Sequence, residues 1–303
     1  MKAGQKSWAL YVFSSANALR KYSMEELVAL GVSWIWLGLE SPHCGYEKLR
    51  GTDTLALVHE LHAHGIKVLG STIVGLEHHT PENIEAELEH AVGHNTDFHQ
   101  FMLYTPAPGT PLYAEMAGQG RMLNGMDVAD MHGQDKFNFV HAAITQDDSK
   151  RWLDWAFRRD FDRNGPSLYR IIHTMLAGWK PCGNDSDVRI RSRFATEARP
   201  LRSISAALLW AMEHRLNSSR PELSDKIRTL RQDIGREFGL ISRVITAVLG
   251  PFLLWRTGRE AGRLARGATY EPQPFIDRRN WTAVTRSETP LRYPAPHRAA
   301  QAQ

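Results

Sequence analysis

Four short apolar segments alternate with helical patterns, and they constrain the fold of this chain more than any other feature. The segments are residues 8–13, 32–39, 66–74 and 98–104. Segments that are apolar throughout are typical of strands buried in a parallel sheet. A parallel connection needs a crossover, so the intervening helices would cover that sheet. The sequence therefore predicts an α/β fold.

Helix signals stand between these segments. Residues 23–26 (Ser-Met-Glu-Glu) form a capping box, which opens a helix. Residues 54–64 carry apolar side chains at helical spacing, and Gly65 follows where glycine commonly ends a helix. Thr80 precedes a proline and an acidic residue, an order that predicts a helix from Thr80 to about His94. The chain thus repeats a βα unit.

Four such strands would form part of an α/β barrel or an open doubly wound sheet. In both folds, functional residues lie at the carboxyl ends of the strands. Ser14, Ser15 and Asn17 at the first end fit two interpretations equally, ligand contact or turn and capping chemistry. The four ends are residues 14–17, 40–41, 75–77 and 104–106.

The pattern becomes entirely helical from about residue 147. Pro251 should kink or break the last helix. Residues 268–303 are rich in proline and arginine, and we expect an irregular tail there. The expected helices are 148–164, 166–179, 187–198, 201–216, 223–238 and 240–266. The predicted parts are a half barrel (1–120), a connecting segment (121–146), an all-helical C-terminal domain (147–267) and the tail (268–303).

Charge is distributed unevenly along the chain. Residues 1–150 have a net charge of −8, whereas residues 151–303 have a net charge of +12. A basic region can meet nucleic acid or an anionic membrane, or it can be a solvated helical surface. Residues 189–193 are rich in arginine without interleaved aromatic side chains, so we expect no nucleic-acid binding.

The sequence predicts a reduced, cytoplasmic protein. It has two cysteines, Cys44 and Cys182, which are far apart and form no motif. The first residues lack the apolar core of an export signal. Residues 240–266 join an apolar run to a basic flank, which fits either a helix lying on the inner membrane surface or a helix packed in the core of the helical domain.

Three short motifs end the second, third and fourth strands. Gly38 lets a ligand approach the backbone, and Glu40 can accept hydrogen bonds from hydroxyl or amino groups. Ile73 and Gly75 offer a flat apolar edge suited to a purine. Tyr104 opens a rigid proline-rich turn. Each motif is weak alone, and their order and spacing are more specific.

This arrangement resembles the C-terminal half of the radical S-adenosylmethionine fold, in the branch with an N-terminal cobalamin-binding domain. The resemblance covers residues 8–115 and extends more loosely to residues 157–170. It implies a partial (βα)6 barrel, of which the four segments are the third to sixth strands, and S-adenosylmethionine as cofactor. The residues that it implies for cofactor binding are Gly38, Glu40, Ser41, Ile73, Gly75, Tyr104, Thr105 and Pro106.

The chain departs from this family at several motifs. The family holds a [4Fe–4S] cluster with a CxxxCxxC motif, which this sequence lacks. The motif for the cofactor's amino group and the cobalamin domain are also missing. Residues 77–79 (Glu-His-His) replace the proline and glycine that usually follow Gly75 and Leu76. We therefore expect that this chain alone does not cleave S-adenosylmethionine reductively.

The resulting hypothesis is a C-terminal portion of a radical S-adenosylmethionine enzyme. The parent reaction would modify or methylate an unactivated carbon of a small hydrophobic substrate. The expected partner is an N-terminal half with the cluster and the cobalamin domain, whether the chain is a truncated product, a split subunit or a degenerate descendant. The alternative is a non-catalytic partner-binding module at a membrane surface. An incomplete barrel also predicts poor solubility or marginal stability.

Histidines are the remaining candidates. His59, His62 and His64 share a predicted helix without the HExxH spacing, and we interpret them as structural or solvated. His78 and His79 are nearer the expected cofactor mouth, where a structural role is again favoured over metal binding. Cys44 is interpreted as a loop or buried thiol. The sequence thus predicts no metal site and identifies no catalytic residue.

Overall fold

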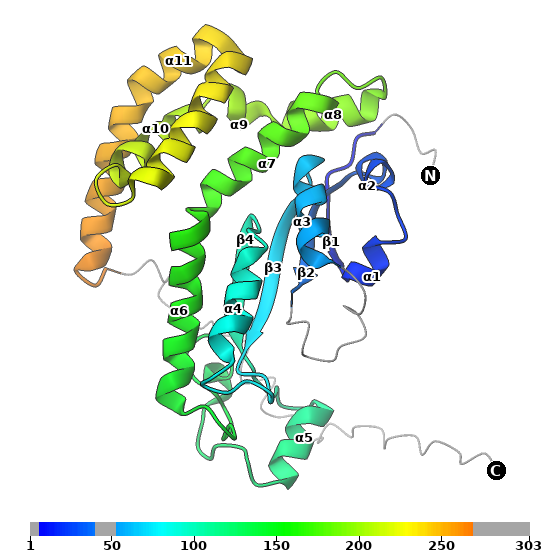
Figure 1. Ribbon diagram of the computed structural model, residues 1–303, viewed down its shortest axis with the longest axis vertical. Helices are drawn as coiled ribbons and strands as arrows, with labels where there is room; N and C mark the ends of the chain where they lie inside the picture. Colours follow the sequence, from blue (N-terminus) through cyan, green and yellow to red (C-terminus); the bar gives the residue numbers. More distant parts are fainter. Residues whose placement is uncertain (1–5, 40–52, 269–303) are drawn as a thin grey trace, which may run out of the picture. The chain divides into compact units, whose positions relative to one another are not determined.

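The computed structural model describes residues 6–39 and 53–268, and its centre is a four-stranded parallel sheet (Figure 1). The strands lie side by side in chain order. Helices separate them in sequence and a helical region follows, which confirms the predicted α/β fold. The strands are β1 (Leu10–Ser14), β2 (Val32–Gly38), β3 (Lys67–Val74) and β4 (Phe98–Leu103).

Local capping chemistry places the first helices. The Ser15 side chain accepts a hydrogen bond from a backbone N–H in the first helix, which is a capping role. The predicted capping box is confirmed: the Glu26 N–H donates to the Ser23 hydroxyl at 3.1 Å, and the Ser23 N–H donates to the Glu26 carboxylate at 2.7 Å. These helices are α1 (Ala16–Leu19), α2 (Met24–Leu30) and α3 (Thr54–Ala63).

The helix predicted from Thr80 begins four residues later. It is α4 (Ile84–Gly93), and residues 81–83 form a turn instead of its first helical residues. The Asn83 side chain explains the difference, because its oxygen accepts from the Thr80 N–H at 2.8 Å and its nitrogen donates to the His78 carbonyl at 2.8 Å. Asparagine commonly competes with helix formation in this way.

The proline-rich turn after β4 leads into a helix that the sequence analysis missed. This helix is α5 (Pro111–Gly118), which has Thr110 as its N-cap and a proline in its first turn. A 3-10 turn at Val128–Asp130 follows. The chain then returns to the sheet, where the Gly133 carbonyl accepts from the Leu103 N–H at 2.8 Å. The predicted connecting segment thus packs against β4.

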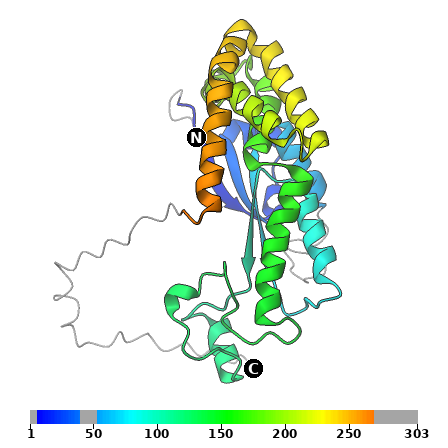
Figure 2. The same cartoon turned by 90° about the vertical axis from the view of Figure 1, so that its left-hand side faces the viewer.

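Helices cover one face of the sheet. Side chains such as Ile35, Leu37 and Val68 point into a core with α2 and α3. Phe101 and Leu103 point the same way into a second core with α4 and the first helix of the helical region, which runs beside α4 (Figures 1 and 2). The alternate side chains on the other face are half-buried or exposed, except for Val32 and Lys67, which are buried at the starts of β2 and β3.

The helical region contains six helices within the described residues. The helix predicted at 201–216 is divided in two, because the backbone at Ser203 is not helical. The helices are α6 (Gln146–Asn164), α7 (Ser167–Cys182), α8 (Val188–Glu197), α9 (Arg199–Arg202), α10 (Ser205–Leu216) and α11 (Pro221–Ala265).

The long helix α11 is interrupted at Gly239. Glycine there has φ 68° and ψ −147°, a conformation that other residues rarely adopt. The sequence placed a helix boundary between residues 238 and 240, which agrees with this interruption; it also predicted a kink or break at Pro251, where the backbone keeps helical dihedral angles. The two predicted helices, 223–238 and 240–266, therefore correspond to the two halves of α11.

Buried polar contacts link the sheet to α8. The Lys67 ammonium on β3 is 2.6 Å from the Glu197 carboxylate, and Lys67 is almost completely buried. The buried Arg193 guanidinium donates to the Val28 and Val32 carbonyls at 3.0 and 3.2 Å. Residues 1–257 accordingly form one compact unit, and residues 258–303 form a second. The four predicted parts of the chain remain predictions.

Candidate functional site

Strand register places small and polar residues in a row near the carboxyl ends of the central strands. Gly38 pairs with Ser71, and Ser71 pairs with Gln100. All three are half-buried on the open face of the sheet. Ile73 and its partner Met102 follow on the same face, nearer the carboxyl ends. The row is therefore a polar floor, small at Gly38 and Ser71, and it is bordered by apolar side chains.

A second row of large apolar side chains crosses the open face two residues earlier. Phe13, Trp36, Leu69 and Phe98 pair successively across the four strands. The rings of Phe13 and Trp36 stack with centroids 4.6 Å apart. The apolar Phe13 side chain is 73% exposed to solvent. We call these four residues the apolar row; such exposed apolar surface marks binding sites in many proteins.

The end of β3 is packed by the chain itself. Gly75 has φ 79°, which favours glycine. A Cβ atom built there would lie 2.2 Å from Cζ of Phe137, so the ring occupies the space that a side chain would need. Phe137 is fully buried. The predicted glycine is thus required by the protein's own packing, and contact with a cofactor remains a prediction.

Hydrogen bonds fix the end of β4 next to β3. The Tyr104 N–H donates to the Val74 carbonyl at 2.8 Å. The Thr105 hydroxyl donates to the Leu103 carbonyl at 2.8 Å, and the buried Asn138 amide donates to the Pro106 carbonyl at 2.6 Å. Tyr104, Thr105 and Pro106 therefore lie at the same edge of the sheet as Ile73 and Gly75.

Six of the eight predicted cofactor residues thus lie along the carboxyl edge of the sheet. Glu40 and Ser41 lie outside the described residues, as does Cys44. Cys182 is buried at the end of α7, where burial and the nearby Asp185 raise the pKa of its thiol. It is therefore poorly suited to act as a thiolate. The six residues are Gly38, Ile73, Gly75, Tyr104, Thr105 and Pro106.

Two histidines clamp the turn after β3: His79, which the sequence placed near the expected cofactor mouth, and His141, which it did not assign to this edge. The His79 Nδ1 atom accepts from the Gly75 and Leu76 N–H groups at 3.0 and 3.2 Å. His141 Nδ1 accepts from the Ala143 and Ile144 N–H groups, so its Nε2 carries the proton and donates to the Leu76 carbonyl at 3.1 Å. We call His79 and His141 the histidine clamp.

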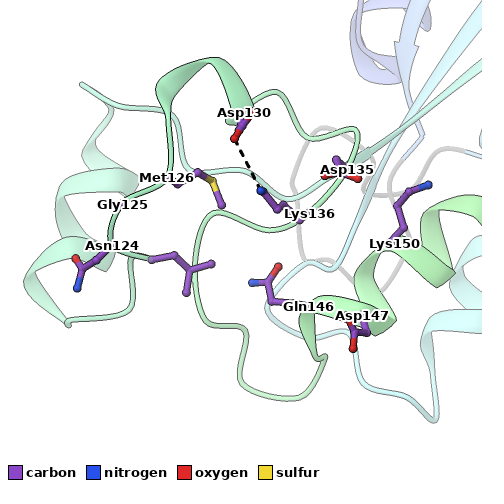
Figure 3. Close-up of a pocket in the computed structure, with 10 residues that line it drawn as sticks. Asn124, Gly125, Met126, Asp130, Asp135, Lys136, Gln146, Asp147 and Lys150 are labelled. Atoms are coloured by element: carbon purple, nitrogen blue, oxygen red, sulfur yellow. Dashed lines mark ion pairs between the residues drawn. The ribbon is translucent and has the colours of Figure 1, made fainter.

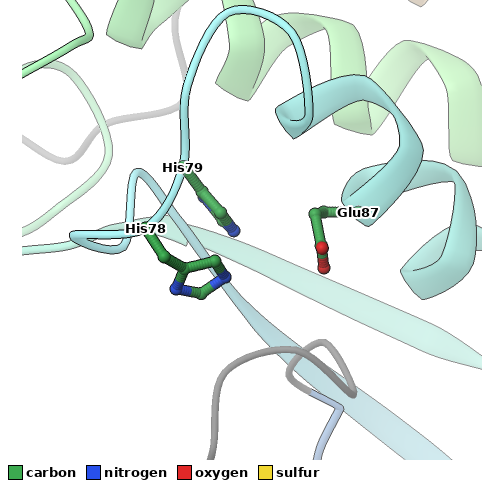
Figure 4. A group of neighbouring side chains, drawn as sticks. All are labelled: His78, His79 and Glu87. Atoms are coloured by element: carbon green, nitrogen blue, oxygen red, sulfur yellow. The ribbon is translucent and has the colours of Figure 1, made fainter.

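A group of possible metal ligands includes one member of this clamp. Nitrogen atoms of His78 and His79 and a carboxylate oxygen of Glu87 lie within 4.8 Å of one another (Figure 4). Burial and the neighbouring His78 lower the pKa of His79 to about 4, so its imidazole is neutral at pH 7. Because Nδ1 accepts two hydrogen bonds, the proton is on Nε2, which leaves no lone pair for a metal. The geometry favours a hydrogen-bonded group.

The histidines of α3 also have structural partners. His62 Nε2 is 2.9 Å from the fully buried Asp97 carboxylate, which accepts from the Val68 N–H at 2.7 Å. His64 Nδ1 is 2.8 Å from the Glu60 carbonyl, and His59 is exposed. These contacts join α3 to the sheet, and they provide no convergent set of metal ligands.

A cavity lies in the segment between α5 and α6. It has a volume of about 710 Å³, and its walls carry carboxylates and lysines (Figure 3). The Lys136 ammonium is 3.8 Å from the Asp130 carboxylate across it. None of the six described cofactor candidates lines this cavity. We therefore base the candidate site on the strand ends.

Fold and strand ends together define an α/β protein with a candidate ligand site at the carboxyl edge of a parallel sheet. No protein-family model matches the chain. Bacteriochlorophyllide d C-12(1)-methyltransferase of Chlorobaculum tepidum is 31% identical to it over 114 residues, which cover 35% of this chain and 25% of that protein. The chain thus matches about a quarter of the length of this relative. The similarity is a distant homology to a methyltransferase and links the chain coarsely to methylation.

Proposed function

We propose that the chain binds S-adenosylmethionine at the carboxyl edge of its sheet and contributes this site to a radical S-adenosylmethionine enzyme that methylates carbon. The observation that carries the proposal is the floor formed by Gly38, Ser71 and Gln100, next to Ile73. Gly38 and the short Ser71 side chain leave room for the ribose and methionine parts of the cofactor, and the Ile73 side chain offers an apolar contact for adenine. Homology to a methyltransferase supports the same cofactor.

The apolar row supports a hydrophobic, ring-containing substrate. Phe13, Trp36, Leu69 and Phe98 adjoin the proposed cofactor floor on the same face of the sheet. Aromatic side chains favour offset stacking with other rings. The relative's name describes a methyltransferase acting on a bacteriochlorophyllide. We propose a flat hydrophobic substrate for this chain too, bound beside the methyl donor.

The residues of this chain do not fit a [4Fe–4S] cluster. Such a cluster in this family needs three thiolates, and the sequence has two cysteines, of which Cys182 is buried with a raised pKa. We assign the cluster, and with it cobalamin, to a partner portion of the enzyme. The outer edge of β1 supports this assignment, because β1 pairs with β2 alone among the described strands. A further strand can pair there.

The same open edge favours a second candidate function, a non-catalytic module that binds a partner protein by strand pairing. The two functions differ in one property. A module that lost its enzymatic role need not bind S-adenosylmethionine, whereas the proposed enzyme portion must. Cytoplasmic location, predicted from the sequence, belongs to both proposals.

Cofactor binding by the full chain tests the proposal. We expect isothermal titration calorimetry to detect S-adenosylmethionine binding. Replacing Ile73 by alanine should weaken that binding at least about 5-fold, since the adenine contact is lost. Leu69→Ala is the matched control, because Leu69 is half-buried on the same strand and face as Ile73 but lies four residues earlier, away from the carboxyl edge. A folded chain that does not bind, or equal weakening by both variants, would contradict the proposal and favour the partner-binding module.

A further inference from the structure

The second half of α11 has its apolar and small residues on unexpected faces. Ser242, Thr246 and Gly250 are buried, at intervals that place them on one side of the helix. A Cβ atom on Gly250 would lie 2.7 Å from the Trp210 ring, so this side packs closely against α10. Soluble helices normally bury their large apolar side chains. Here the small residues contact the protein.

Large apolar side chains occupy the opposite side. Ile241, Val244, Val248, Phe252 and Trp255 recur at intervals of three and four residues, so they form one stripe. Their exposed fractions lie between 54% and 70%. The stripe is about 21 Å long at the rise of an α-helix. We call these five residues the α11 stripe.

The α11 stripe contradicts one of the two interpretations of this segment. A helix packed in the core of the helical domain would bury these side chains, but they are exposed. In the described chain, α11 is the one helix long and apolar enough to cross a membrane. Its small-residue side is already packed against α10, however, and this arrangement suits a helix that lies on a membrane surface.

Charge near the stripe is complementary to an anionic surface. No acidic residue occurs between residues 240 and 259. The exposed Arg256 follows Trp255 directly, and Arg243 lies near the start of the stripe. Tryptophan is enriched where a bilayer meets water, and arginine is favourable beside anionic headgroups. An apolar stripe that ends in a tryptophan followed by an arginine therefore matches the boundary of a bilayer.

We propose that the α11 stripe docks the protein on the surface of an anionic lipid bilayer, with the helix lying in the plane of the interface. This inference goes beyond the proposed function and does not depend on it. A membrane-bound protein could take a hydrophobic substrate directly from the lipid.

Vesicle flotation with the full chain tests the docking. We expect the protein to float with phosphatidylglycerol vesicles and to bind phosphatidylcholine vesicles at least about 5-fold more weakly, since each basic residue near an anionic surface adds to the affinity. Absence of binding to phosphatidylglycerol vesicles would overturn the proposal. Equal binding to both vesicle types would overturn the anionic preference.

A matched pair of variants distinguishes docking by the α11 stripe from non-specific adsorption of the protein to vesicles. Val248 and Val128 are 68% and 67% exposed, so Val248→Asp and Val128→Asp make the same chemical change at similar exposure. Val248→Asp should reduce vesicle binding at least about 10-fold, because a carboxylate would enter the apolar layer. Val128→Asp should have no effect on vesicle binding.

Dimer formation is the alternative outcome. If Val248→Asp converts a dimer to a monomer in analytical ultracentrifugation and vesicle binding is unchanged, the stripe binds a second copy and the proposal is wrong. S-adenosylmethionine affinity, measured in parallel, should be the same in both variants.

Discussion

Two histidine side chains fix the backbone at the carboxyl edge of the sheet, where the candidate site lies. The histidine clamp uses neutral imidazoles, whose lone pairs satisfy backbone N–H groups that would otherwise be buried without acceptors. The same hydrogen bonds determine which ring nitrogen carries the proton. At this edge, histidine therefore serves as a backbone acceptor, although its position near the strand end first suggests metal binding.

Replacing His79 by alanine should destabilise the protein by about 1–3 kcal/mol, because the Gly75 and Leu76 N–H groups lose their acceptor. It should also weaken S-adenosylmethionine binding if the edge binds the cofactor. His78→Ala is the control, since the half-buried His78 side chain does not accept from the Gly75 and Leu76 N–H groups. Urea denaturation measures the stability. A smaller loss for His79→Ala than for His78→Ala would show that the clamp is unimportant.

Buried histidines also predict how stability depends on pH. Burial lowers the pKa of His79 and His94 to about 4 and that of His99 to about 3, below the ordinary value of 6.5. Between pH 4 and 6.5 the unfolded chain therefore binds more protons than the folded chain. The free energy of unfolding should fall as the pH falls through this range, by about 1.4 kcal/mol per pH unit for each histidine.

Urea titrations at pH 7, 6 and 5 measure this dependence. His99→Gln should reduce the slope of the unfolding free energy against pH by about 1.4 kcal/mol per pH unit, the contribution of one proton. His59→Gln is the control, because His59 is exposed on α3. Stability that does not change between pH 7 and pH 5 would contradict the prediction.

Sequence alone could not reveal some residues at this edge. Gly75 was predicted as a site residue from its position after a strand, and the structure adds that Phe137 packs against it. Phe137, Asn138 and His141 reach the strand ends from a segment distant in sequence, and such contacts leave no periodic signal. The alternation of Phe137, Asn138 and Phe139 is the one hint of an extended, packed segment there.

Elements were predictable where local chemistry determines them. The capping box before α2 and the left-handed Gly31 after it depend on nearest neighbours along the chain. The start of α4 was predicted too early, because the Asn83 side chain bonds to the Thr80 N–H and the His78 carbonyl while residues 81–83 form a turn. α5 was missed because its prolines suggested a turn, although proline is well suited to a first helical position.

Two glycines in α11 provide a test of its interruption. Gly239→Ala should destabilise the protein by about 1–2 kcal/mol, because its positive φ is unfavourable for a residue with a Cβ atom. No atom within 4 Å would clash, so the cost is confined to the backbone. Gly235→Ala, in the regular part of the same helix, should instead stabilise by about 0.5–1 kcal/mol. Thermal unfolding followed by circular dichroism would show the opposite signs. A shift of the same sign in both variants would contradict a break at Gly239.

On the scale of the whole molecule, the sheet is covered on one face and open on the other. The apolar segments predicted the sheet and its parallel direction, because both follow from apolar strands that alternate with helices. They could not show which face is covered, because aromatic side chains on the open face look like core residues in a sequence. The difference in net charge between residues 1–150 and residues 151–303 likewise did not indicate that residues 1–257 form one compact unit.

Neighbouring positions on β1 and β2 test this one-sided core. Leu37→Ala should cost about 2–5 kcal/mol, because Leu37 is fully buried under the helices. Phe13→Ala should cost less than about 1 kcal/mol, since Phe13 is largely exposed and loses mainly its stacking on Trp36. Chemical denaturation of both variants provides the comparison. A large cost for Phe13→Ala would mean that the open face is covered in solution.

The ion pair between Lys67 and Glu197 affects how the protein can be divided. Without α8, the Lys67 ammonium would remain in the sheet with its counter-charge removed, and the Val28 and Val32 carbonyls would lose the Arg193 guanidinium. Breaking a buried pair on one side costs about 3–5 kcal/mol. The sheet and α8 should therefore melt in a single cooperative transition. A chimaera that transfers the four strands to another protein should therefore include α8 as well.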